Sequence, residues 1–363
     1  MPHVSSTLIL THGKKIGTVR TDIYISRKGR EVMNQHVEAK IKLFSENYQN
    51  IRGEFIWQEP MAKRMAAFAY ALADKPLESG PIRHCHGLIK KEAGVFSSFR
   101  GLLSVYLAAA LSLNPNPEQV LADTLYVHDL LKDQGFWRND YLVISAYEIA
   151  VNAQRIDFER MAARTRNFYD EMKANHRFLV GQDDYIFAAM LALSGIDEHT
   201  GANKLKGIFI KLKEGFGRFT SKNSLLTLSQ MMVLGSSTDE CVDNITRLSR
   251  ALRKRKIRLD RTYTLPSLGA LGLLNLDYNM LADELIQARD FLRSQKGFGA
   301  FSVSIHEILL YVVSLVTHAH IGDSFSAVTK AGVTTSVTNL IIAQQVAMIV
   351  AITAASTAAA ASC

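Results

Sequence analysis

The feature that most constrains this fold is a pair of helix-like segments that recurs about every 40 residues. The second segment of each pair carries almost no charge. Successive second segments begin at Leu102, Tyr141, Tyr185, Leu225, Leu265 and Ile305, and subtraction of these numbers gives intervals of 39, 44, 40, 40 and 40 residues. Apolar residues in both segments follow the three-and-four spacing of amphipathic helices. One such hairpin cannot bury its own apolar face, so the repeat predicts hairpins that stack on one another.

An earlier pair of segments, 32–51 and 61–74, follows the same pattern. We therefore predict roughly seven hairpins between residues 30 and 317. The predicted fold is all-α, with helical-hairpin repeats that form an α-solenoid, and an irregular helical bundle is the alternative. The first helix of each pair holds most of the charges, so we expect it on the outer surface and the nearly uncharged helix inside.

Two segments outside the repeat divide the chain into three predicted parts. Residues 1–28 contain two short β-branched runs and are expected to form an N-terminal arm or a short hairpin. Residues 29–320 form the helical-repeat domain. Residues 321–363 form an Ala-rich C-terminal helix or tail, which has no charged side chain after Lys330. We expect this tail to pack on the repeats, and the alternatives are self-association, membrane insertion and proteolytic processing.

Cysteine content and charge indicate the cellular compartment and the kind of partner. The three cysteines, Cys85, Cys241 and Cys363, are far apart and odd in number, which argues against a disulfide framework or a CxxC site. The first residues do not form the basic and apolar pattern of a signal peptide, so we expect a cytoplasmic protein. The formal net charge of +8 favours acidic partners in general. No feature of the sequence predicts a cofactor.

Three stretches resemble a known family. They are GVFSSFRGLLSVYLAAAL (94–111), FLVGQDDYIFAAMLAL (178–193) and LIIAQQVAMIVAITAAS (340–356). Through them the chain resembles an uncharacterised bacterial family, the domain of unknown function DUF4003, from about residue 30 to the C-terminus. The resemblance implies one helical domain in a bacterial cytoplasm. It implies no activity, and no catalytic residue is carried over from it.

Asp183, Asp184 and Tyr185 open one of the apolar segments and are the candidate catalytic residues. An Asp at the start of a helix accepts hydrogen bonds from free backbone N–H groups, and the helix dipole favours an acidic first turn. The triplets at 139–141 and 223–225 occupy the equivalent places in the neighbouring repeats. This recurrence favours helix capping, and a binding or acid/base role is the alternative.

Two histidine pairs are the candidate metal ligands. His84 and His86 should point apart on a helix, because residues two apart lie about 200° apart around the helix axis. His318, His320 and Asp323 lie in the loop-like stretch THAHIGDS. An extended backbone there would place both imidazoles on one side near a carboxylate, which suits a divalent ion. Three dispersed ligands are a weak signal, so a structural role is favoured.

The run 247–261 is the most basic part of the chain. Its eight basic residues are Arg247, Arg250, Arg253, Lys254, Arg255, Lys256, Arg258 and Arg261, with Asp260 as the one acidic residue. A solvated helix face is the simplest interpretation. An acidic protein, a membrane surface or nucleic acid are the alternatives, and we take Arg253, Lys254, Arg255 and Lys256 as the candidate partner-binding residues.

We therefore predict a helical-repeat scaffold that binds a protein or peptide partner along its inner face, with the C-terminal helix either capping the stack or joining subunits. The first alternative is a metal-dependent or acid/base enzyme of unknown substrate, and the second is a nucleic-acid-binding protein. A non-enzymatic role is favoured, because the chain contains no GxSxG, Walker or HExxH motif.

Overall fold

A computed structural model describes residues 33–94, 97–235, 239–259, 264–272, 274 and 276–324. The secondary structure of these residues is entirely helical, with fourteen α-helices, three short 3-10 helices and no strand, which confirms the all-α prediction. The α-helices are α1 Gln35–Ile51, α2 Pro60–Leu72, α3 Ser79–Glu92, α4 Ser104–Ser112, α5 Pro117–Asp133, α6 Asp140–Asn152, α7 Phe158–Asn175, α8 Tyr185–Leu193, α9 Glu198–Phe216, α10 Lys222–Leu234, α11 Asp239–Lys254, α12 Ser267–Leu271, α13 Tyr278–Ser294 and α14 Ile305–Ser324. The 3-10 helices are η1 Ser98–Arg100, η2 Arg155–Asp157 and η3 Gln182–Asp184.

The chain divides into two compact units, 1–33 and 34–363, and every described helix belongs to the second. The predicted N-terminal arm, 1–28, and the predicted tail from residue 325 onward lie outside the described residues. The domain boundary predicted at residue 320 falls inside α14, which continues to Ser324.

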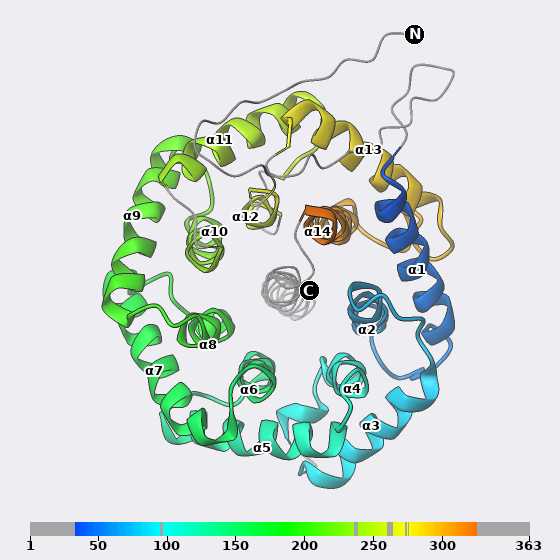
Figure 1. Ribbon diagram of the computed structural model, residues 1–363, viewed down its shortest axis with the longest axis vertical. Coiled ribbons are helices and arrows are strands. Elements are labelled where there is room, and N and C mark those ends of the chain that lie inside the picture. The colour runs from blue at the N-terminus through cyan, green and yellow to red at the C-terminus, as the bar shows by residue number, and fades with distance from the viewer. Residues whose placement is uncertain are drawn as a thin grey trace, which may run out of the picture. The chain divides into compact units, whose positions relative to one another are not determined.

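The helices of the second unit lie in two concentric layers (Figure 1). The odd-numbered helices form the outer layer and the even-numbered helices form the inner layer, so each hairpin has one helix in each. Each outer helix packs on the inner helix of its own hairpin, and successive outer helices from α3 to α13 contact each other, as do α13 and α1. The fourteen described α-helices alternate between the layers as seven consecutive pairs, whereas their arrangement as an α-solenoid of repeats stays a prediction.

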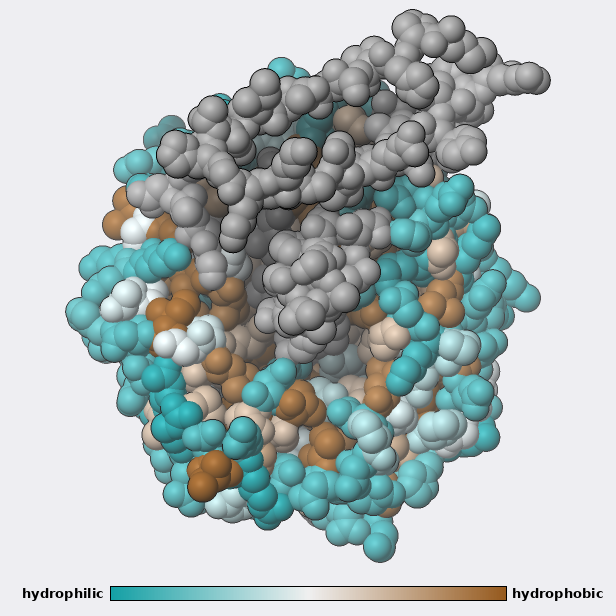
Figure 2. Space-filling model, viewed as in Figure 1, coloured by the Kyte–Doolittle hydropathy of each residue, from teal (hydrophilic) through white to brown (hydrophobic). Residues whose placement is uncertain are grey.

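Charge sorts the helices between the layers as the sequence predicted. On the outer helix α9, the buried residues Leu205, Ile208 and Leu212 form one stripe, and lysines occupy the exposed face. On the inner helix α8, every residue from Tyr185 to Ala192 is buried. Figure 2 shows hydrophilic side chains around the periphery of one face and apolar ones nearer its middle. The inner helices thus supply the core.

The helix α12 is much shorter than its counterparts. The sequence pattern predicted an inner segment that begins at Leu265, but the helix covers only Ser267–Leu271. Pro266 stands at its N-cap and Gly272 at its C-cap, and both residue types end helices.

Among the described residues, no helix combines the length and the apolar character needed to cross a membrane.

The first and last hairpins contact each other and close the double layer into a ring. The outer helix α1 packs against α13 and α14, and α2 also touches α14 (Figure 1). Tyr48 of α1 lies against Gly297, where the φ of +90° and a distance of 2.8 Å from the ideal Cβ position to the tyrosine ring both require glycine. Gln49 donates a hydrogen bond to the carbonyl of Lys296 at 2.5 Å.

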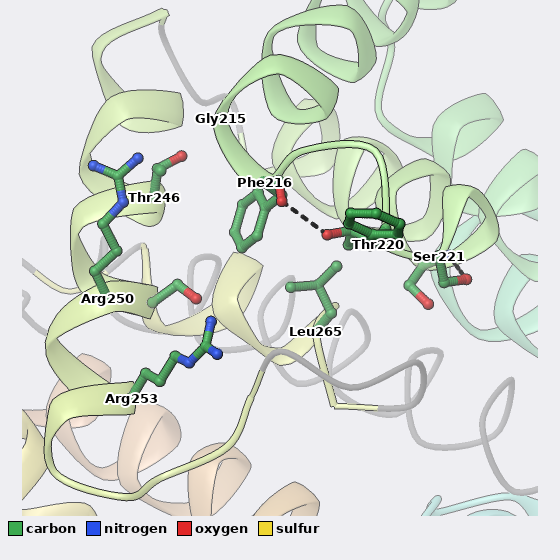
Figure 3. Close-up of a pocket in the computed structure, with 11 residues that line it drawn as sticks. Gly215, Phe216, Thr220, Ser221, Thr246, Arg250, Arg253 and Leu265 are labelled. Atoms are coloured by element: carbon green, nitrogen blue, oxygen red, sulfur yellow. Dashed lines mark hydrogen bonds between the residues drawn. The ribbon is translucent and has the colours of Figure 1, made fainter.

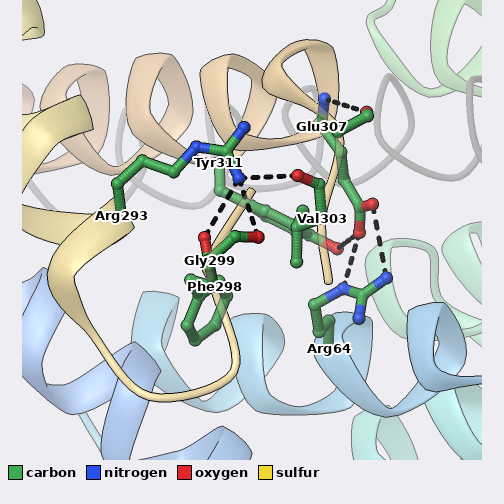
Figure 4. Close-up of polar contacts among 8 residues, drawn as sticks. Arg64, Arg293, Phe298, Gly299, Val303, Glu307 and Tyr311 are labelled. Carbon is green, nitrogen blue, oxygen red and sulfur yellow. Dashed lines mark hydrogen bonds and ion pairs between the residues drawn. The ribbon is translucent and has the colours of Figure 1, made fainter. Parts of the chain in front are cut away.

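A buried ion pair lies at the centre of this closure (Figure 4). The guanidinium of Arg64 on α2 donates to both carboxylate oxygens of Glu307 on α14, at 2.6 and 3.3 Å. The hydroxyl of Tyr311 donates to the same carboxylate at 3.2 Å. Phe44 packs on Tyr311 and on Phe298, with ring centroids 4.8 and 5.0 Å apart. Polar and aromatic contacts therefore join segments that are 243 residues apart in the sequence.

Candidate functional site

The basic run lies mostly on α11 and in the turn after it. Val242, Ile245, Leu248 and Leu252 are buried and point toward the core, since their spacing keeps them on one helix face. The remaining surface carries exposed arginines at every third position, Arg247, Arg250 and Arg253. Residues three apart are neighbours on a helix surface, so these guanidinium groups form a row.

Two adjoining cavities open along this row, and we call them together the α9–α11 cleft. The first has a volume of about 550 Å³ and is lined by Gly215, Phe216, Phe219, Thr220, Ser221, Ser224, Thr246, Ser249, Arg250, Arg253 and Leu265 (Figure 3). The second has a volume of about 760 Å³ and is lined by Lys211, Glu214, Gly215, Val242, Asp243, Thr246, Arg247 and Arg250. Arg250 lines both cavities.

The cleft exists because α9 and α11 approach closely at Gly215. A Cβ at this position would lie 2.8 Å from Oγ1 of Thr246, so a larger residue would push the two helices apart. The helix α9 then ends with Gly217 at its C-cap, where the φ of +81° favours glycine. Ser221 caps α10 by accepting a hydrogen bond from the backbone N–H of Ser224. The turn between the two helices forms one wall of the cleft.

The charge of the cleft is predominantly positive. Within the described part of the chain, Arg250 forms no ion pair, and the same is true of Arg247. Thr246 and Ser249 add hydroxyl groups, while Phe216 and Leu265 add apolar surface. Guanidinium groups donate in a fork that matches a carboxylate or a phosphate. The cleft can therefore bind an acidic group and hold its apolar neighbour.

The structure separates the four residues predicted to bind a partner. Arg253 lines the cleft, whereas Arg255 forms a two-bond ion pair with Asp283, at 2.5 and 3.1 Å. Lys254 and Lys256 are exposed and line neither cavity. Arg247 and Arg250 belong to the predicted basic run but are not among its four candidate partner-binding residues. Their three-residue spacing on the polar face of α11 was the signal for them.

Asp183 and Asp184 have different environments at the start of α8. The side chain of Asp184 is 3% exposed, accepts a hydrogen bond from the backbone N–H of Gly181 at 2.8 Å, and accepts another from the amide of Gln230 at 2.5 Å. Asp183 is half-buried and accepts from the amide of Asn223 at 3.3 Å. Burial, together with the charge of Asp183, raises the pKa of Asp184 to about 7. Through their hydrogen bonds to Gln230 and Asn223, the two carboxylates join the hairpin of α8 to the hairpin of α10.

Tyr185 belongs to an aromatic cluster at the same helix end. Its ring lies 4.7 Å from that of Phe136 and 5.2 Å from that of Tyr169, in edge-to-face geometry. Its hydroxyl accepts a hydrogen bond from the backbone N–H of Trp137 at 3.5 Å. All three candidate catalytic residues therefore have structural partners, and neither cavity of the α9–α11 cleft includes them.

Removing the carboxylate of Asp184 is expected to destabilise the protein more than removing that of Asp183. Asp184→Ala leaves the Gly181 N–H without an acceptor and the buried Gln230 amide with only the weak thioether acceptor of Met172, which costs about 2 to 3 kcal/mol. Asp183→Ala loses one partly exposed bond and is expected to cost less than about 1 kcal/mol. Urea unfolding of both variants measures the difference. Equal losses would show that the buried network contributes nothing beyond a surface contact.

The histidine candidates lie on helices, and the extended backbone predicted for THAHIGDS is wrong. His318 and His320 are both part of α14 and point to different sides of it. His318 is buried, and burial lowers its pKa to about 4, so it is neutral at pH 7. His320 contacts Glu284 at 2.6 Å, and the side chain of Asp323 lies outside the described residues. The shared face that motivated a metal site is absent.

The first histidine pair diverges on α3 as predicted. His84 is exposed and lies 3.1 Å from Glu118, whereas His86 is buried with its ring 5.1 Å from that of Phe55. Between them, burial raises the pKa of the Cys85 thiol to about 11. Considering the described residues alone, no group of three or more His, Cys, Asp or Glu side chains has a geometry that could hold a metal ion.

Comparison with protein families gave a match over most of the chain. The family described as "Protein of unknown function (DUF4003)" matches residues 47–346. The chain belongs to the DUF4003 family. The match begins within α1 and extends past the end of α14, so this DUF4003 protein has all its inner helices within the family region. Comparisons with curated proteins and with solved structures found no match.

Proposed function

We propose that this DUF4003 protein is a non-enzymatic, cytoplasmic scaffold that binds an acidic segment of a protein or peptide partner in the α9–α11 cleft. The observation that carries the proposal is Arg250, an exposed guanidinium that lines both cavities and forms no ion pair with any described carboxylate. Arg247 and Arg253 extend the positive surface to either side.

The size and the lining of the cleft support a peptide as the ligand. Cavities of about 300 to 1,000 Å³ hold drug-sized ligands, and a few side chains of a peptide occupy a comparable volume. The apolar side chains of Phe216 and Leu265 lie beside the arginines, so a carboxylate with an apolar neighbour would satisfy both parts of the lining. The sequence predicted binding along the inner face of the stacked hairpins. The proposed site lies instead between α9 and α11, because the first and last hairpins contact each other and close the row into a ring.

Self-association remains part of this proposal. The segment predicted to join subunits, residues 321–363, lies almost entirely outside the described residues. Its support is the sequence alone, which has no charged side chain after Lys330. Light scattering of the full chain and of a chain that ends at Lys330 measures the oligomeric state, and identical monomers would contradict self-association.

Charge reversal in the cleft is expected to weaken the binding of acidic peptides. The probe is a fluorescent peptide with repeated Glu residues, and its Gln analogue is the reference ligand. Arg247→Glu, Arg250→Glu and Arg253→Glu together are expected to weaken binding by roughly tenfold or more, since each exposed charge pair contributes about 0.5 to 1 kcal/mol. Fluorescence anisotropy at low and high salt measures this loss.

The matched control reverses three exposed lysines outside the cleft, Lys75, Lys204 and Lys206, and changes the net charge by the same amount. It is expected to retain the affinity of the wild type apart from a small long-range effect. Equal weakening in both triple variants would indicate nonspecific attraction to a basic protein. Tighter binding of a single-stranded oligonucleotide than of the acidic peptide would instead favour the nucleic-acid alternative.

A further inference from the structure

One rim of the helix ring displays a set of strongly exposed aromatic side chains. They are Trp57, Trp137, Phe178, Phe219 and Phe301, and their exposed fractions range from 73% to 108%. Each lies in a turn that leads from an outer helix to the inner helix of the same hairpin. Of the other large apolar side chains in the described part of the chain, only Ile56 and Ile156 exceed 70% exposure. Phe96 and Tyr263 belong to the two remaining turns and lie outside the described residues.

These turns lie at the same end of the inner layer. Asn139, before α6, donates a hydrogen bond to the side chain of Gln182, before α8. Asp183, also before α8, accepts from Asn223 at the start of α10. The turn before α14 contacts the end of α1 through Lys296 and Gln49. The N-terminal ends of successive inner helices are therefore neighbours, and the five turns define one rim, which we call the aromatic rim.

Folding does not account for these exposed rings in the turns before α6 and α14, because a separate buried aromatic residue anchors each of these two turns. Phe136 is 5% exposed and packs on Tyr169 and Tyr185, while Trp137 beside it faces solvent. Phe298 is fully buried in the ring closure, three residues before the exposed Phe301. Isolated exposed apolar residues are ordinary on protein surfaces. Recurrence at one structural position in five hairpins is not.

Each of the same five turns also has an exposed cation. These residues are Arg52, Arg138, Arg177, Arg218 and Lys296, each within five positions of its aromatic neighbour. None of them forms an ion pair with a described carboxylate. Most of the acidic residues in these turns, by contrast, are buried or already bonded to another side chain. Asp184 is buried, Asp183 binds Asn223 and Glu54 binds Arg83, so Glu59 is the exposed exception.

We propose that the aromatic rim docks on the surface of an anionic lipid bilayer. Trp and Phe side chains settle at the level of the lipid headgroups, and exposed Arg and Lys are attracted by anionic lipids. The aromatic residues are separated by whole hairpins, so they form points around a ring and not a continuous patch. A stable protein partner needs about 800 Å² of continuous surface on each side, whereas a bilayer accepts separate side chains at once.

The two tryptophans allow a direct test on the full-length protein. The chain contains 2 tryptophans, Trp57 and Trp137, and both lie on the aromatic rim. Mixing with phosphatidylcholine vesicles that contain phosphatidylserine is expected to shift their emission to shorter wavelength. Lipids with brominated acyl chains are expected to quench it. Vesicles of phosphatidylcholine alone should cause little change. Absence of both effects with anionic vesicles would overturn the proposal.

A pair of triple variants separates the rim from other modes of binding. Phe178→Ser, Phe219→Ser and Phe301→Ser together keep both tryptophans and are expected to weaken vesicle binding at least about tenfold in cosedimentation. Ile156→Ser, Ile210→Ser and Met280→Ser remove exposed apolar side chains away from the rim and are expected to leave binding unchanged. Undiminished binding of the first variant, or equal weakening of both, would assign the attraction to charge or to the C-terminal segment and would refute docking through the rim.

Discussion

Arg64→Ala is expected to destabilise the protein by about 3 to 5 kcal/mol, the largest effect that we predict for a single polar substitution. Removing Arg64 leaves the carboxylate of Glu307 buried without its partner, since both side chains are less than 10% exposed. The same carboxylate would keep only the hydroxyl of Tyr311 as a donor. Because the pair joins the first and last hairpins, its loss also weakens ring closure. Urea-induced unfolding, followed by circular dichroism, measures the change.

Two control variants test whether the effect comes from the uncompensated charge. Arg64→Met combined with Glu307→Leu removes both charges and keeps most of the volume, so it is expected to unfold near the wild-type midpoint. Arg160→Ala breaks an exposed ion pair with Asp157 and is expected to cost less than about 1 kcal/mol. A double variant as unstable as Arg64→Ala would indicate that packing, and not the buried charge, dominates this contact.

Glu148→Gln is expected to remove a large pH dependence of stability. Glu148 is 1% exposed on the inner helix α6, and burial raises its pKa to about 8, with Asn152 as a hydrogen-bond donor to the carboxylate. The folded protein thus holds a proton that the unfolded chain releases near pH 4.5. Above that pH the folded state binds more protons, so stability falls as the pH rises toward 8. The stability that Glu148 contributes is fully present below about pH 4.5, the pKa of Glu in the unfolded chain, and is lost as the pH rises to about 8.

The expected size of this effect follows from the shift in pKa. A change from 4.5 to about 8 corresponds to on the order of 5 kcal/mol, lost progressively across that interval. Urea unfolding of wild type and Glu148→Gln between pH 4 and pH 9 should show the variant gaining on the wild type by this amount. Other titrating groups, including Asp184, are present in both proteins and cancel in the difference. Glu46→Gln, at an exposed site, should track the wild type, and parallel curves for Glu148→Gln would contradict the prediction.

Local sequence patterns predicted the helices well where hydrophobic spacing dominates. The second segments that begin at Tyr141, Tyr185, Leu225 and Ile305 all correspond to inner helices that start within a few residues of these positions. The stretch THAHIGDS was predicted as a loop because Gly322 and the histidines favour helix weakly. Tertiary packing overrode that preference, since His318 is buried and His320 contacts Glu284 on α13.

The candidate sites required contacts between hairpins that no local pattern describes. Asp184 looked like a helix cap, and it does accept from Gly181, but its second partner, Gln230, is 46 residues away on α10. The α9–α11 cleft depends on the close approach of Gly215 to Thr246, which only the folded chain reveals. The aromatic rim was readable in part, because Trp137, Phe178 and Phe219 are spaced 41 residues apart in the sequence. The sequence did not show that these side chains are exposed.

The sequence by itself determined the number of hairpins, the alternation of charged and uncharged helices, and the all-α class. These properties follow from the periodicity of apolar residues, which acts over distances of one or two helices. Only the tertiary structure decided that α1 and α14 meet, that Arg64 pairs with Glu307, and that the exposed turns share a rim. Such contacts depend on the small rotation from each hairpin to the next, summed around the ring, and no short stretch of sequence encodes that sum.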